Sequence, residues 1–303
     1  MAGNPFDGGG GSLMKFRRTI DDWTLFGSIF DKIGRRFLST IFGQQLLLFF
    51  RTLHSVFAEG RNFCTDLRNV IRQIYFTVVE VFPVLLVVAV LTGTVTIVEA
   101  MTVMPRVGFS DAFGGLMVVV LVREIGPILT AFLVSGRSGS ALTTMIGTMA
   151  INSEVDALST LGVNPIRYLV MPALFGGVIS MFLANILFSV CGICGGFALA
   201  KLLVLASGET LNLNLSWHYF SKSILLSLTA TDFVMMVLKP VVFGIIIFIN
   251  SCYHGLNIRR DIRLVPKATS RSVVYSFLYV IVVDVLFSLF YIFDYANQMS
   301  RII

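Results

Sequence analysis

Long apolar runs separated by short polar segments dominate the chain from residue 77 onward. A helix needs about 20 apolar residues to cross the hydrocarbon core of a bilayer. We therefore predict spans at residues 78–98, 113–134, 166–204, 225–249 and 273–292, the second with room to continue to Gly147. The third run is too long for one perpendicular crossing, so we expect a tilted helix that breaks near Gly192, Gly195 and Gly196. The pattern predicts an all-α integral membrane protein with five transmembrane helices.

Residues 20–76 have an amphipathic pattern instead. Apolar side chains recur there at helical spacing and charged side chains take the opposite face, as in a helix that lies in the membrane interface. The apolar positions are Trp23, Phe26, Phe30, Ile33, Phe37 and Ile41. We predict three regions: a flexible Gly/Ser-rich lead-in at residues 1–19, an interfacial amphipathic helical region at 20–76 and a five-span domain at 77–303.

Composition agrees with a membrane protein. Of 303 residues, 56% are hydrophobic and 13% charged, and the mean hydropathy is +0.85, well outside the usual range for a soluble domain. Cys191 and Cys194 form a CxxC, but no histidine or carboxylate lies nearby, so we interpret them as packing residues. The three histidines are scattered, and we predict no metal site.

The basic residues predict the orientation of the chain, because Lys and Arg accumulate on the cytoplasmic side of a membrane. Ten of them precede the first span, and five more (Arg259, Arg260, Arg263, Lys267 and Arg271) separate the fourth and fifth spans. The alternate loops hold only Arg106, Lys201 and Lys222. We predict a cytoplasmic N-terminus and a C-terminus on the opposite side. The net charge of +6 then reflects topology, and we expect no nucleic-acid binding.

A short helix is predicted between the second and third spans, at about residues 152–162. Ser153 followed by Asp156 resembles a capping box, and Gly162 is a typical helix stop. Asn164 and Pro165 then favour the start of a new helix. Two interpretations stay open from the residues alone: a docking element for a soluble partner, or an ordinary connector.

Charged residues inside the apolar runs are the candidate functional residues. Arg123 and Glu124 are adjacent, and neighbours on a helix point about 100° apart, so we expect each to find a partner elsewhere. Asp232 and Lys239 share one face of the fourth span. We predict that Arg123 pairs with Asp232 and Glu124 with Lys239, either to fix helix register or to contact substrate. Glu99 is a candidate for the outer mouth of the cavity.

Small residues cluster just after this charged pair. Gly136, Gly139 and Gly147 alternate with serines in a pattern that lets helix backbones approach closely. We interpret them as positions of helix packing or of a dimer contact.

Two stretches, "REIGPILTAFLVSGRSGSALTTMIGTM" and "VDALSTLGVNPIRYLVMP", resemble the signature of the MlaE/YrbE permease family, the membrane subunits of ABC-type lipid transporters that work with MCE proteins. The likeness extends over about residues 72–284 and includes "CGICGG" and "LKPVVFG". The chain departs from the family pattern at Met145, Ala150 and Ser189 and in the loop "NIRRDIRLVP". These departures affect the expected contacts with other subunits and leave the fold unchanged.

The resemblance implies a homodimeric permease of the bacterial inner membrane with a periplasmic C-terminus. It implies that the short helix is a coupling helix that contacts an ABC ATPase, through Ser153, Glu154, Asp156, Ala157, Leu158, Leu161 and Gly162. The expected substrate is a membrane lipid, most simply a phospholipid. The expected partners are a second copy, the ATPase, an MCE-domain protein and, in some systems, a small cytoplasmic accessory subunit.

Two candidate functions, an ATP-driven permease and an ion-coupled transporter, differ in their energy source. The sequence contains no G-x-x-x-x-G-K-[ST], so we expect this chain to carry no cofactor and no catalytic residue, with ATP and Mg bound by the partner ATPase. The alternative is a secondary transporter coupled to an ion gradient through Glu124 and Asp232. No inverted repeat with paired broken spans supports that alternative.

Overall fold

The computed structural model describes residues 41–58, 63–107, 113–206, 217–258 and 261–300. The chain divides into two compact units, residues 1–50 and 51–303, and each is described by itself. Helix α3 (Ile41–Ala58) begins in the first unit. Residues 20–40 of the predicted interfacial region lie outside the described residues.

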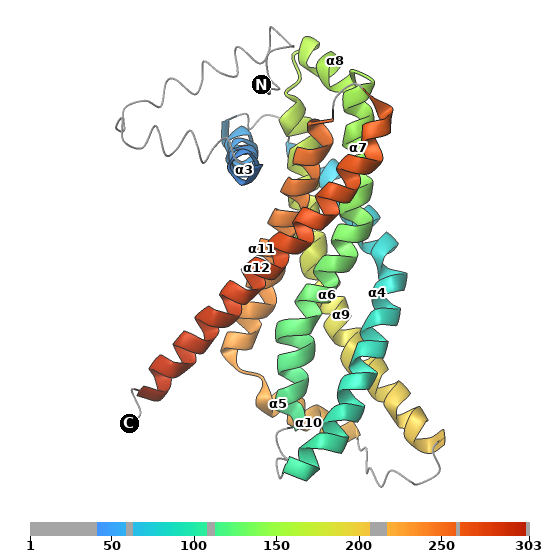
Figure 1. The fold of residues 1–303 in the computed structure, drawn as a ribbon, viewed down its shortest axis with the longest axis vertical. Coiled ribbons are helices and arrows are strands. Elements are labelled where there is room, and N and C mark those ends of the chain that lie inside the picture. The colour runs from blue at the N-terminus through green and yellow to red at the C-terminus, as the bar shows by residue number, and fades with distance from the viewer. Residues whose placement is uncertain (1–40, 59–62, 108–112, 207–216, 259–260, 301–303) are drawn as a thin grey trace, which may run out of the picture. The chain divides into compact units, whose positions relative to one another are not determined.

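Five helical stretches of the second unit are long and apolar enough to cross a membrane, which confirms the predicted number of spans. They are Leu67–Thr102, Gly114–Ile151, Ile166–Ala206, Ala230–Leu256 and Ile262–Tyr291. The described ranges contain helices and no strands. Figure 1 draws the short helix α8 (Glu154–Thr160) at one end and the helices α5 (Phe113–Met117) and α10 (Trp217–Ser227) at the other. We call these the α8 end and the α10 end.

The first and third spans pack through glycines, and here the structure differs from the prediction made from the sequence. Helix α9 (Met171–Ala206) continues through Gly192, Gly195 and Gly196, so the predicted break is wrong. These glycines face α4 (Phe63–Val107). A Cβ on Gly93 would overlap the Gly192 carbonyl, and one on Gly196 would lie 2.6 Å from the Gly93 carbonyl carbon. The glycines are therefore a glycine seam that lets two backbones touch.

The fourth span begins later than predicted. Residues 217–227 form the separate helix α10, and α11 (Ala230–Leu256) starts only after a break at Leu228 and Thr229. The Thr229 amide donates to Asp232 Oδ2 at 2.9 Å, which satisfies one of the free amides at the helix start. Helix α10 packs on α5, where the Gly114 amide donates to Ser223 Oγ at 3.0 Å. The apolar pattern missed this break because both helices are apolar.

The second span changes helix type along its length. Two π-helical segments, η2 (Val118–Glu124) and η3 (Ser135–Gly139), flank α6 (Ile125–Val134), and α7 (Ser140–Ile151) continues to the α8 end. Single π turns inside α-helices are frequent at functional sites. Another, η4 (Ile166–Val170), begins the third span. The last span consists of η5 (Ile262–Leu264) and α12 (Val265–Ser300).

The glycine seam gives a matched pair of substitutions. We expect Gly93→Ala to lower the free energy of unfolding by about 1–3 kcal/mol, the usual cost of overpacking, because the new Cβ meets backbone. Gly115→Ala is the control, since its nearest neighbour would be Ser227 Oγ at 3.9 Å. Thermal unfolding in detergent, followed by circular dichroism, compares the two. Equal stability of the two variants would refute the close approach.

Candidate functional site

Lys239 is the centre of a cluster of charged side chains between three spans. Its side chain is 2% exposed. The ammonium donates to Glu124 Oε2 at 2.9 Å, to Asp284 Oδ1 at 2.9 Å and to the backbone carbonyl of Arg123 at 3.1 Å. An ammonium has three protons, so each finds an acceptor. We call Arg123, Glu124, Asp232, Lys239 and Asp284 the charge cluster.

A proline explains why a backbone carbonyl is available to Lys239. In an α-helix the carbonyl of Arg123 would accept from the amide of residue 127, but that residue is Pro127 and has no N–H. The carbonyl therefore has no α-helical partner, and the ammonium occupies its place. The proline removes the α-helical donor to this carbonyl, and the buried lysine supplies a donor in its place.

Arg123 has three neighbours. Its guanidinium lies 3.8 Å from Asp232 Oδ1, 3.5 Å from Glu124 Oε1 and 3.1 Å from the centre of the Tyr291 ring. A cation over an aromatic face is stabilised by the ring quadrupole. Both predicted pairs, Arg123 with Asp232 and Glu124 with Lys239, are therefore present. Arg123 and Glu124 also approach each other, because two long side chains bridge the angle between their Cα–Cβ bonds.

Three members of the site were missed in the sequence, and all lie on α12. Asp284 pairs with Lys239, Ser288 Oγ donates to Glu124 Oε2 at 3.0 Å, and Tyr291 stacks under Arg123. They are spaced by four and three residues, which places them on one helix face. That spacing, with a lone carboxylate in "YVIVVDVLFSLFY", was the signal available in the sequence.

The charge cluster lies deep within the spans. Glu124 is ten residues from the start of its span at Gly114, and Lys239 is nine residues from Ala230. At a rise of about 1.5 Å per residue, these separations correspond to roughly 14–15 Å, half the thickness of a hydrocarbon core of about 30 Å. Two spans counted independently thus place the Glu124–Lys239 pair at the same depth, with Asp232 nearer the α10 end.

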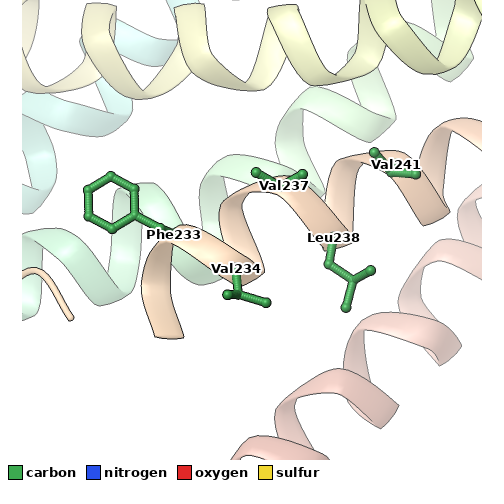
Figure 2. A pocket seen from close by; sticks show the side chains of 5 residues that line it. All are labelled: Phe233, Val234, Val237, Leu238 and Val241. Carbon is green, nitrogen blue, oxygen red and sulfur yellow. The ribbon is translucent and has the colours of Figure 1, made fainter. Parts of the chain in front are cut away.

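The other side of α11 carries an apolar groove. Phe233, Val234, Val237, Leu238 and Val241 line an open hollow of about 440 Å³, shown in Figure 2. Phe233 and Val234 are more than half exposed. Helix α11 therefore has two different faces, one directing Asp232 and Lys239 into the cluster and one presenting an apolar groove.

Helix α8 has the predicted stop but not the predicted start. Ser153 adopts a left-handed conformation (φ 58°) and its side chain makes no cap, so the expected capping box is wrong. Gly162 (φ 78°) ends the helix as predicted: its amide donates to Ser159 and the Val163 amide to Leu158, the two bonds of a Schellman turn. Asn164 caps the next helix, accepting from the Ile166 amide at 3.1 Å.

None of the residues of α8 is buried. Glu154, Asp156 and Ala157 are exposed, Leu158 is partly buried, and Leu161 just beyond the helix is 77% exposed. An apolar side chain as open as Leu161 at the tip of a bundle is available to another protein. The rest of the chain does not cover this helix in the described structure.

The remaining predicted residues lie apart from the charge cluster. Glu99 is exposed on α4. Gly139 packs against Ser251 and Ile247, and Gly147 against Ile258, so both serve contacts with the α11 region. A Cβ on Gly136 would meet no described atom within 4 Å. The described residues contain no group of three potential metal ligands.

Comparison with known proteins gives a consistent result. The family described as Permease MlaE matches residues 70–290. A probable ABC transporter permease protein of Rickettsia felis is 31% identical over 213 residues, 70% of this chain and 79% of that protein. One from Synechocystis is 31% identical over 252 residues, 82% and 90% of the two chains. The chloroplastic protein TRIGALACTOSYLDIACYLGLYCEROL 1 of Arabidopsis thaliana is 29% identical over 225 residues, 74% and 61%.

The charge cluster predicts a large effect of removing its central cation. Lys239→Gln leaves the Glu124 carboxylate without its ammonium partner, and breaking a buried pair in this way costs about 3–5 kcal/mol. The double variant Lys239→Gln with Glu124→Gln should recover part of that loss. Denaturant titration in detergent measures both. The control is Lys222→Gln on the exposed surface of α10, and equal stability of the two lysine variants would contradict the proposed role of Lys239.

Proposed function

This chain belongs to the MlaE permease family, and we propose that it is the permease subunit of an ATP-driven transporter that exchanges lipid, most simply phospholipid, between the bacterial inner membrane and an MCE-protein channel. The family and the five apolar spans make it a multi-pass membrane protein. The lipid, the ATPase, the MCE protein and the membrane are parts of the proposal.

The observation that carries the proposal is the uncovered helix α8. It is closed by a Schellman turn, joined directly to the second and third spans, and leaves Leu161 in the open. Such a helix is suited to seat in a groove of a soluble subunit. No P-loop sequence occurs in these 303 residues, so ATP and Mg would be bound by that subunit.

A path of contacts connects α8 with the charge cluster. Helix α8 follows α7, and the Thr143 hydroxyl of α7 lies 3.2 Å from both the Ser251 carbonyl of α11 and Ser272 Oγ of α12. Helices α11 and α12 carry Lys239 and Asp284. A displacement of α8 by a closing ATPase would thus reach both helices that meet at the Lys239–Asp284 contact.

Three features support a lipid substrate and a second copy. The groove on α11 is lined by apolar side chains, and α12 exposes large apolar residues such as Leu278, Val285 and Phe290. The name of the Arabidopsis relative contains that of a lipid, trigalactosyldiacylglycerol. Two copies would enclose a cavity for one lipid between them, with spans one, two and five of each copy as its walls.

The orientation of the proposal follows from charge. Arg263, Lys267 and Arg271 are exposed at the α8 end, which supports a cytoplasmic position for that end under the positive-inside rule. The N-terminus then lies in the cytoplasm and the C-terminus in the periplasm. An ATPase at the cytoplasmic end and an MCE protein at the periplasmic end are compatible with this arrangement.

The energy source is decided by one experiment. We expect the chain to co-purify with an ATPase and lipid transfer to stop when that ATPase is inactivated, with no response to collapse of the ion gradient. The opposite result would favour a gradient-coupled carrier that uses Glu124 and Asp232. In the structure both carboxylates already face fixed cations, Lys239 and Arg123, so less of their negative charge is available to bind a transported ion.

The role of α8 is tested by Asp156→Lys and Leu158→Trp in the purified complex. We expect lipid transfer per ATP hydrolysed to fall about 5- to 150-fold, the range of a coupling free energy of about 1–3 kcal/mol, with membrane insertion intact. Lys222→Asp, a charge reversal at the α10 end, is the control. Normal transfer in the α8 variants would exclude this helix as the coupling element.

A further inference from the structure

The charges of the cluster do not balance. Two cations, Arg123 and Lys239, face three carboxyl groups, Glu124, Asp232 and Asp284, which leaves a formal charge of −1 if all are ionised. The other two side chains described in contact with the cluster, Ser288 and Tyr291, are neutral. The five charged side chains are between 2% and 28% exposed.

An unbalanced charge at this depth is unfavourable. An ion that leaves water loses its hydration, and a membrane interior returns that loss only through a partner of opposite charge. Where no partner exists, the group takes up or loses a proton and becomes neutral. One additional positive charge would make the cluster neutral.

The hydrogen bonds indicate which carboxyl group takes it. Glu124 receives Lys239, Ser288 and the nearby Arg123. Asp232 receives the Thr229 amide at the start of α11, with Arg123 on its other oxygen. Both carboxyl groups thus have a donor or a cation at each oxygen.

Asp284 is less well supplied. The Lys239 ammonium is the one donor that the described residues offer to its carboxyl group, and this bond engages Oδ1. The side chain is 10% exposed and contacts the central Lys239. Its second oxygen is left for a hydrogen atom.

We propose that Asp284 holds a proton at neutral pH and that the charge cluster is a proton-binding site inside the spans. The 2.9 Å contact with Lys239 persists in this state, because the carbonyl oxygen of a neutral carboxyl group still accepts from an ammonium. Protonation makes the five charged groups neutral in sum. Movement of α12 away from α11 would admit water to Asp284 and release the proton.

Infrared spectroscopy of the full-length protein in lipid nanodiscs tests this proposal, because a protonated carboxyl group has a C=O stretch that a carboxylate lacks. We expect this band at neutral pH, its shift in deuterated water, and its loss in Asp284→Asn. Asp261→Asn, which changes an exposed carboxylate in the loop before α12, should retain the band. Absence of the band in the unmodified protein would overturn the proposal and favour a bound cation, such as an ammonium headgroup.

A second variant tests the charge balance without touching Asp284. Glu124→Gln removes one negative charge while its amide oxygen still accepts from Lys239 and Ser288. The remaining two cations and two carboxylates balance, so Asp284 should ionise and the band should disappear. Persistence of the band in correctly folded Glu124→Gln would overturn the proposal. The readout needs neither nucleotide nor lipid transfer and is decided independently of the transport function.

Discussion

An ammonium group buried between membrane-spanning helices must have every proton bound, and the arrangement of three spans follows from how Lys239 meets that requirement. Its acceptors come from η2 and α12, while the lysine itself stands on α11. Each acceptor fixes both the rotation and the height of its helix, because a slide of one turn would move a carboxylate by about 5.4 Å. Pro127 has no N–H and so cannot donate to the Arg123 carbonyl, which accepts from Lys239 instead.

The other spans are held by a different kind of contact. Helix α9 meets α4 along the glycine seam and meets α11 through Gly244, whose Cβ would lie 3.0 Å from the Val178 Cα. These contacts bring backbones together over apolar surface and do not exchange easily. Helix α12 contacts α11 through Asp284 with Lys239 and Asn250 with Ser276, packs Phe277 against Phe132, and exposes many of its apolar side chains. Helices α4, α9 and α11 are thus joined by close backbone contacts, whereas α12 belongs to the least buried of the five spans.

Much of this could be predicted from the sequence because the bilayer limits the possibilities. Five apolar runs required five spans, and buried charges required partners on facing helices. Because Asp232 and Lys239 share one face of the fourth span, they could be matched with Arg123 and Glu124 from the sequence. Gly162 ends one helix and Asn164 caps the next through residues close to them in the sequence, so both roles could be predicted from it. The failures have a common origin: the role of Gly192 depends on Gly93, ninety-nine residues away, and nothing near it in the sequence distinguishes a kink from a seam. Asp284 was overlooked because only three-dimensional contact shows that Lys239 serves two carboxylates.

The two π-helical segments of the second span have a consequence for how the family can vary. A π turn closes its hydrogen bond one residue further back than an α turn, so η2 and η3 each contain residues that an uninterrupted α-helix would not accommodate. Deleting one residue from η2 would therefore turn its π turn into an α turn and leave α5 and α6 close to their present orientation, with Gly114 still beside Ser223. The second span can thus absorb a change of one residue within η2 or η3, whereas Arg123 and Glu124 must keep their contacts with Lys239. The residues of the charge cluster are therefore a stricter mark of this architecture than the spacing between Gly114 and Pro127.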